Sequence, residues 1–454
     1  MNKQLIYAIG VTCAAITLAG CTPSWDYSNG VPLSPTVEYK TPEEIDAHRS
    51  ESDENLILAE NTPDGGKLVI EDSNLLIDEK KQAISLDYNT SFERGLYKQY
   101  AKKYAGKNFT FSPYSLLDAF SILYPVTSGS SREEMDSVLS FEDKSEYFYR
   151  QYDGDGSSNL DIANIVYYRP DLEDYINLDN FDGANIAPYE TLDKVNEFVS
   201  NATHGKIENF INDEGLIKDN VITIINALYF RKNFLETYEK DTILFNGSET
   251  ESFSGTLKPA NLKEMTPEID LIRLPYSTSG PGENQYALYI FANADEDKDA
   301  VKEYIDSVSD EDLHKALDFR EYVGNGKYST IKFNVKAFEA RTKNEEVTDS
   351  LKVMGLTSPF KEDCLDFNEN LFYSGTPVSD TPTYISAVIQ EACVETNYEG
   401  TEASAATEVA LSLTSSASIV TDEAIKYVNT YNPFVFVIKD DTNDTIMFMG
   451  RIEE

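Results

Sequence analysis

The stretch from Glu399 to Asp422 (EGTEASAATEVALSLTSSASIVTD) alternates between two kinds of side chain. From Thr401 onward, apolar and threonine residues fall on one side and mostly polar residues on the other, which is the period-2 pattern of a strand with one buried face. The residues also fit an amphipathic helix or a flexible Ala/Ser linker, because Ala is a good helix former. The pattern alone leaves strand, helix and linker open.

The segments on either side of this stretch predict core strands. Thr383–Val394 upstream is apolar enough to be a buried strand. Downstream, Pro433–Ile438 and Thr445–Arg451 predict two strands joined by a turn at Asp440–Asp444. The alternating stretch is therefore strung between core strands and has no hydrophobic anchor of its own.

Further strands and helices are predicted in mixed order along the chain. Strands are expected at Leu160–Tyr168, Val221–Phe230, Asp270–Tyr276, Tyr286–Ala292 and Ser329–Phe338. Helices are expected at Ser91–Tyr104, after Ser112 as an N-cap with Pro113 in the first turn, within Val195–Phe210, and from Glu345 toward Phe360. Because strands and helices do not alternate strictly, the pattern favours an α+β fold.

Three of these segments give the chain a resemblance to the serpin family. Glu399–Ala406 (EGTEASAA) resembles the serpin hinge, Asn432–Phe436 with Phe448–Arg451 (NPFVF and FMGR) resembles the C-terminal hairpin, and Asn108–Tyr124 resembles the second helix. The resemblance covers Ser85–Glu454. It implies a single α+β domain with large mixed β-sheets, about nine helices and an exposed reactive-centre loop.

The resemblance also assigns roles to individual residues. The hinge would be Glu399, Gly400, Thr401, Glu402, Ala403, Ser404, Ala405 and Ala406. Beneath the point where the main sheet parts, the shutter would comprise Asn108, Ser112, Ser115 and Gln390, the last standing where a His is common. The cleaved bond would join Thr414 and Ser415, although the lengthened loop leaves Leu411, Leu413 and Val420 as alternatives.

The implied function is suicide inhibition of serine proteases. A protease would cleave the loop, and the hinge side would then enter the main sheet and trap the enzyme. The bait VALSLTSSASIV offers no cation, so elastase- or subtilisin-like enzymes are expected, with papain-like cysteine proteases also possible targets. The alternatives are a non-inhibitory serpin acting as a surface binding or chaperone-like protein, and a solute-binding lipoprotein with a ligand cleft between two α/β lobes.

The N-terminal segment predicts export and lipid attachment. Residues 1–20 form a signal peptide with Lys3 and an apolar run too short to span a bilayer comfortably, and Leu18–Cys21 (LAGC) resembles the bacterial lipobox. Acylated Cys21 would anchor the protein on an extracytoplasmic membrane face, either at the cell surface or facing the periplasm. Residues 21–84 are acidic and polar and predict a disordered tether before a domain at 85–454.

The composition of the chain limits the classes of molecule that it is expected to bind. The net charge is −41, so nucleic acid and heparin are not expected to bind, whereas 41% apolar residues are enough to build a core. We expect a monomer with no cofactor. Cys364 and Cys393 are expected to be buried free thiols, although a disulfide is permitted in this compartment.

Catalytic signals are weak. The chain has three histidines, of which His48 lies in the tether, while His204 and His314 are expected at the surface. We find no G-x-S-x-G, H-E-x-x-H or C-x-x-C spacing. The sequence therefore predicts neither an enzyme nor a metal site.

Overall fold

The computed structural model describes residues 90–141, 160–181, 184–278, 283–293, 297–401 and 424–454, together with short strands between residues 17 and 71. The chain divides into two units, Met1–Ile84 and Ser85–Glu454. In the first unit, β5 (Leu68–Glu71) pairs with β1 (Thr17–Leu18) and β4 (Leu56–Ala59), and β2 (Tyr27–Ser28) pairs with β3 (Val31–Pro32). Cys21 lies outside the described residues, and the signal peptide, the lipid anchor and the tether stay predictions.

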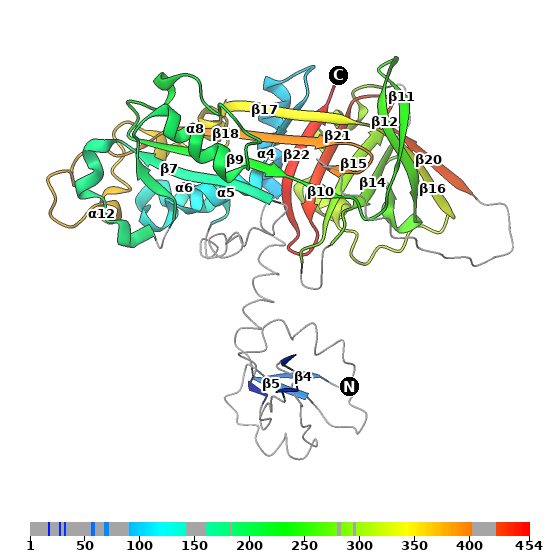
Figure 1. Cartoon of the computed structure of the whole chain (residues 1–454), viewed down its shortest axis with the longest axis horizontal. Coiled ribbons are helices and arrows are strands. Elements are labelled where there is room, and N and C mark those ends of the chain that lie inside the picture. Colours follow the sequence, from blue (N-terminus) through cyan, green and yellow to red (C-terminus); the bar gives the residue numbers. More distant parts are fainter. Residues whose placement is uncertain are drawn as a thin grey trace. The chain divides into compact units, whose positions relative to one another are not determined.

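The second unit contains three sheets (Figure 1). The main sheet comprises β7 (Leu160–Tyr168), β8 (Ile186–Pro188), β9 (Ile222–Phe230), β10 (Lys232–Asn233), β17 (Phe338–Glu346), β18 (Ile385–Thr396) and β19 (Gly400–Thr401). A six-stranded sheet comprises β6 (Phe109–Phe111), β13 (Leu262–Glu264), β14 (Ile269–Pro275), β15 (Tyr286–Asn293), β21 (Phe434–Asp440) and β22 (Thr445–Ile452). A four-stranded sheet comprises β11 (Glu239–Phe245), β12 (Ser248–Leu257), β16 (Thr330–Lys336) and β20 (Ile425–Asn429).

Eight α-helices lie among the described residues. They are α4 (Thr90–Lys103), α5 (Pro113–Ser121), α6 (Gly129–Leu139), α8 (Leu192–Ala202), α9 (Ala300–Ser307), α10 (Asp310–Leu317), α11 (Thr348–Val353) and α12 (Asn368–Leu371). Ser112 caps α5 as predicted, because its hydroxyl accepts the Ser115 N–H at 3.1 Å and Pro113 occupies the first turn. The mixed sheets and helices confirm the α+β class.

Opposite faces of the main sheet are covered by different helices. Alternate residues of β9 point to opposite sides, so Ile224 joins the large core that includes α5, while Ile225 packs in a second cluster with Val195 and Val199 of α8. The sheet is therefore buried on both faces, as its nearly continuous apolar strands require.

Strand β17 was not predicted from the sequence. Its segment FEARTKNEE carries little apolar alternation, yet it pairs with β18 from Phe338↔Thr396 to Glu346↔Ile389. A register shift between Thr342 and Glu345 interrupts the pairing. The predicted strand at Ser329–Phe338 ends in the structure at Lys336, and β17 begins two residues later.

Candidate functional site

The central feature of the main sheet is the seam between β9 and β18. These two strands are parallel and directly paired from Ile222↔Ile385 to Tyr229↔Cys393. Asn226 lies opposite Gln390 across this seam, and Asn164 of β7 lies opposite Asn226 on the other side. Three amide side chains thus form one row across three apolar strands.

Residues at the N-terminal end of α5 form hydrogen bonds with this row. Gln390 Nε2 donates to Asn226 Oδ1 at 2.6 Å and to the Ser112 carbonyl at 3.0 Å. The Ser115 hydroxyl donates to Asn226 Oδ1 at 2.9 Å. Ser112, Ser115, Asn226 and Gln390 are all fully buried. The structure therefore brings three of the four predicted shutter residues together under the seam.

Further hydrogen bonds extend this cluster at both ends, and each donor side chain lies on the same side of its acceptor along the row. The Tyr100 hydroxyl donates to Gln390 Oε1 at 3.3 Å, Asn226 Nδ2 donates to Asn164 Oδ1 at 2.5 Å, and Asn164 Nδ2 donates to Asp118 Oδ2 at 2.5 Å. Burial raises the pKa of Asp118 to about 7, and the hydrogen bond from Asn164 offsets only part of this rise. The chain of donors therefore ends on a carboxylate that titrates near neutral pH.

Asn108 is a correction to the predicted shutter. Its Oδ1 accepts the backbone N–H groups of Glu453 at 2.7 Å and Glu454 at 3.1 Å, and its Nδ2 donates to the Glu339 carbonyl at 3.4 Å. It therefore ties the C-terminus to the start of β17 instead of lying under the seam. The reason is its place before β6, which pairs with β22 near the end of the chain.

Sequence reasoning missed Asn226 and Asn164. Each is a single amide within an otherwise apolar strand, ITIINALYF and LDIANIVYY. A buried amide needs partners, so an isolated Asn in such a strand was the available signal.

The described part of the hinge is held at one end of the seam. Gly400 and Thr401 form β19, which pairs with β10 through Lys232↔Thr401 and with β18 through Thr396↔Thr401. Thr401 is fully buried, and its hydroxyl lies 2.5 Å from the Tyr276 hydroxyl and 3.1 Å from the Thr396 hydroxyl. The first hinge residues thus already occupy positions in the sheet.

Gly400 is required by its surroundings. Its φ is +155°, and a Cβ built there would lie 2.2 Å from the Lys232 carbonyl oxygen. The neighbouring Glu399 carbonyl accepts the Phe234 N–H at 2.9 Å, which fixes the turn. The remaining hinge residues, Glu402, Ala403, Ser404, Ala405 and Ala406, lie outside the described residues, as do Thr414 and Ser415.

Two of the three histidines lie in the described part of the chain, and each contacts a carboxylate. His204 Nε2 lies 3.3 Å from Asp161 Oδ1, and His314 Nε2 lies 2.9 Å from Asp444 Oδ2. His204 is exposed as predicted. The His314 side chain is only 24% exposed, because it packs against the buried Asp444. Cys364 and Cys393 are buried free thiols, as predicted.

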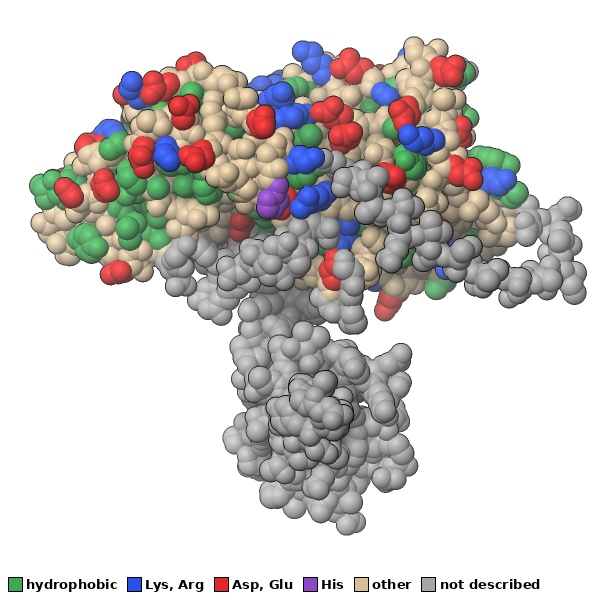
Figure 2. All heavy atoms as spheres, viewed as in Figure 1, with side chains coloured by type: hydrophobic (Ala, Val, Ile, Leu, Met, Phe, Trp, Pro, Cys, Tyr) green, Lys and Arg blue, Asp and Glu red, His purple; other side chains and the backbone are tan. Residues whose placement is uncertain are grey.

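No group of three or more His, Cys, Asp or Glu side chains in the described ranges is arranged to hold a metal ion. Within these ranges, no helix has the length and apolar character needed to cross a bilayer. On the face shown in Figure 2, acidic and basic side chains are interspersed.

Comparisons with known proteins agree with this geometry. The family model Serpin (serine protease inhibitor) matches residues 87–454. An uncharacterized serpin-like protein of Methanosarcina mazei is 25% identical over 391 residues, covering 80% of this chain and 86% of that protein. Serine protease inhibitor 2 of Anopheles gambiae is 24% identical over 408 residues, covering 81% of this chain and 90% of that protein.

A solved structure has the same fold. The structure of maspin superposes with a TM-score of 0.65 at 17% identity, covering 82% of this chain and 99% of that chain. The family match extends from α4 to the C-terminus and includes both the seam and the hinge. This chain therefore belongs to the serpin family.

Proposed function

We propose that this serpin inhibits serine proteases by inserting its cleaved reactive segment between β9 and β18. The observation that carries the proposal is the hinge, because Gly400 and Thr401 already pair with strands at one end of the seam. Cleavage would free the following residues to extend β19 into the sheet. The protease, still joined to the severed end as an acyl-enzyme, would be carried along and distorted.

The hinge pairs predict the register of the inserted strand. Thr401 pairs with Thr396, so continuing the antiparallel register by six residues brings Thr407 opposite Gln390. On the other side, Thr401 pairs with Lys232, and six residues further Thr407 reaches Asn226. Extended along both edges, this register would bring Thr407 between the two amides that close the seam.

This register also decides which side chains face the core. Thr401 and Thr396 are directly opposite and their hydroxyls touch, so they share a face of the sheet. Residues at even spacing from Thr401, namely Ala403, Ala405, Thr407 and Val409, would enter the same core face. Glu402 and Glu408 would point to the opposite face. The apolar and threonine side of the alternation would thus match the core face of the sheet.

Insertion would be strongly favourable. Each new backbone hydrogen bond contributes about 0.5–1.5 kcal/mol net, so a dozen inserted residues would contribute on the order of 10 kcal/mol. The uncleaved fold would then be metastable and protected by a kinetic barrier. Trapping would then require that insertion be faster than hydrolysis of the acyl-enzyme.

The sequence of the bait supports a choice of target. Residues around Thr414 and Ser415 are small or apolar, which suits the primary pockets of elastase- and subtilisin-like serine proteases, with papain-like cysteine proteases as further targets. We also propose a monomer held by acylated Cys21 on an extracytoplasmic membrane face, supported by the LAGC sequence.

The proposal is tested by incubating the protein with elastase and with a subtilisin-like protease. An SDS-resistant complex that joins one protease to the N-terminal part of the inhibitor should form, and the intact mass of the released C-terminal fragment identifies the bond. The cleaved protein should also unfold at a higher temperature than the intact one. Clean cleavage without a complex and without thermal stabilisation would overturn the proposal and favour a non-inhibitory surface protein.

A further inference from the structure

The strand β10 meets the hinge on the side of β9. It consists of two residues, which form the pairs Lys232↔Thr401 and Asn233↔Gly400, and among the described strands its ladder partner is β19. The hinge packs against the β10 backbone without free space, since a Cβ on Gly400 would lie 2.2 Å from the Lys232 carbonyl oxygen and 2.7 Å from Asn233 Cα. A small displacement of β10 would therefore displace the hinge with it.

The side chain of Lys232 is buried, although most lysines extend into water. This side chain is 2% exposed, and its Nζ forms an ion pair with Glu283. The ammonium group also lies 5.6 Å from the centroid of the Tyr286 ring, within the range of a cation–π contact. Removing the partner of a buried ammonium group is strongly unfavourable. The position of β10 is therefore coupled to the position of Glu283.

Glu283 belongs to the segment that connects β14 with β15, and the two residues after it are fixed to the six-stranded sheet. Asn284 Nδ2 donates to Asp440 Oδ2 at 2.8 Å, and the Gln285 N–H donates to Thr442 Oγ1 at 2.8 Å. Asp440 ends β21, and Thr442 lies in the turn between β21 and β22. The ion pair therefore ties the receiving edge of the hinge to the β21–β22 hairpin.

The first residues of the same connecting segment contact both β10 and the hinge. The Ser277 N–H and hydroxyl both donate to the Asn233 carbonyl, at 2.9 and 3.1 Å. The Tyr276 hydroxyl lies 2.5 Å from the Thr401 hydroxyl, and the Tyr276 ring stacks on Phe234 with centroids 5.1 Å apart. The two ends of one connecting segment thus hold β10 and the first hinge residues.

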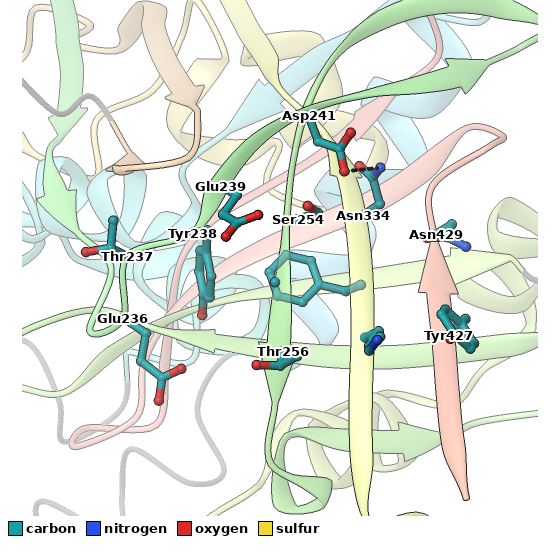
Figure 3. Close-up of a pocket in the computed structure, with 13 residues that line it drawn as sticks. Glu236, Thr237, Tyr238, Glu239, Asp241, Ser254, Thr256, Asn334, Tyr427 and Asn429 are labelled. Carbon is teal, nitrogen blue, oxygen red and sulfur yellow. Dashed lines mark hydrogen bonds between the residues drawn. The ribbon is translucent and has the colours of Figure 1, made fainter. Parts of the chain in front are cut away.

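The chain that follows β10 is held by aromatic packing. The Phe234 and Tyr238 ring centroids lie 5.1 Å apart, and Tyr238 meets Phe333 of β16 edge to face at 4.9 Å. Figure 3 shows Tyr238 on the segment that leads into β11. None of these three rings belongs to the ion pair, so the charges of Lys232 and Glu283 can be changed while the aromatic packing is kept.

We propose that the Lys232–Glu283 ion pair holds β10 as the receiving edge for the hinge and thereby sets how often a cleaved reactive segment traps its protease. Both are positioning residues, since neither is part of the segment that is cleaved. The inference rests on the proposed inhibitory function and names residues that this function requires. With β10 displaced, insertion would start from a hinge outside the sheet, and hydrolysis of the acyl-enzyme would release more of the protease.

Hydrogen exchange of the Thr401 amide in the intact protein tests the position of the hinge. Glu283→Ala leaves the Lys232 ammonium group without its partner and should raise the exchange rate at least about tenfold. The variant Lys232→Glu/Glu283→Lys keeps an ion pair with its charges exchanged, and it should return the rate to within about threefold of wild type. Should Glu283→Ala fail to fold, Glu283→Gln takes its place with the same expected direction.

The stoichiometry of inhibition tests the effect on trapping, measured with an elastase- or subtilisin-like protease at a temperature where circular dichroism shows every variant folded. Glu283→Ala should consume at least about threefold more inhibitor per trapped protease, and the charge exchange should restore the wild-type value. Glu264→Ala is the matched control. Its side chain is 23% exposed against 25% for Glu283, and it pairs with Lys327 at 2.6 Å, away from β10. The control should keep the wild-type stoichiometry.

The outcomes separate the two proposals. If the wild-type protein forms no SDS-resistant complex with any protease, the inhibitory function fails and the role of the ion pair in trapping fails with it. If wild-type complexes form and Glu283→Ala traps with wild-type stoichiometry, the ion pair has no such role and the inhibitory function stands. An equal rise in stoichiometry for Glu264→Ala also overturns the role of the ion pair, because a general loss of stability would then explain both variants.

Discussion

Replacing Gln390 with leucine should remove the polar closure of the seam while keeping the side-chain volume. In the intact protein, Gln390 Oε1 accepts the Tyr100 hydroxyl at 3.3 Å and the Ser112 N–H at 3.4 Å. Both donors are buried, and an unmet buried donor costs about 1–3 kcal/mol. Because both bonds are long, we take the lower part of this range and expect a loss of about 3 kcal/mol in the free energy of unfolding.

The measurement is urea-induced unfolding of the intact protein, followed by circular dichroism and extrapolated to zero denaturant. Gln285→Leu is the matched control, because Gln285 is exposed and its side chain makes none of these contacts. The control should stay within about 0.5 kcal/mol of wild type, as most exposed substitutions do. A Gln390→Leu variant that matches this control would refute the argument that the amide row holds the seam.

Three further predictions address the hinge, the register and the carboxylate. Gly400→Val should expel β19 from the sheet, because its Cβ would lie 2.2 Å from the Lys232 carbonyl oxygen; hydrogen exchange of the Thr401 amide should rise and the SDS-resistant complex should fall in yield. Thr407→Arg should turn the inhibitor into a substrate and cut complex yield about tenfold or more, since burying an unpaired charge costs several kcal/mol. Glu402→Arg should have little effect, because the same register would put it between Glu395 and Arg231, which are exposed; gel analysis of complex against cleaved product decides this. Burial raises the pKa of Asp118 to about 7, so the folded protein holds this proton more tightly than the unfolded chain; the resulting stability is present in acid and is lost as pH rises toward 7. Urea midpoints measured from pH 5 to pH 8 should show a smaller decline in Asp118→Asn than in wild type, and parallel curves would contradict this.

The sequence anticipates those parts of the fold that have strong local patterns. Strand β7 matches its predicted bounds of Leu160–Tyr168, and the helix predicted at Ser91–Tyr104 is α4, Thr90–Lys103. Strand β17 was not predicted from the sequence, because it is held by pairing with β18 and not by its own apolar residues. Local propensity cannot report a strand that is held by a neighbour distant in sequence.

The same limit applies to the site. Ser112, Ser115 and Gln390 were assigned through resemblance to a family, and the structure places them together. Asn226 and Asn164 were recognised as part of the site only in the structure, because their role depends on the register of three strands. Asn108 was misplaced for the opposite reason: it precedes Ser112 closely in sequence, but its side chain serves the C-terminus.

The amide row explains how a sheet can stay closed and still accept a strand. In the closed seam, Asn226 and Gln390 satisfy each other. In the proposed inserted state, the Thr407 hydroxyl lies between them and can both donate and accept. A half-open seam would break the bond from Gln390 Nε2 to Asn226 Oδ1 before Thr407 could replace it, at about 1–3 kcal/mol for each group left unmet. The arrangement between the two end states is therefore the costly one, so the polar cluster raises the barrier to insertion without making the closed state the more stable of the two.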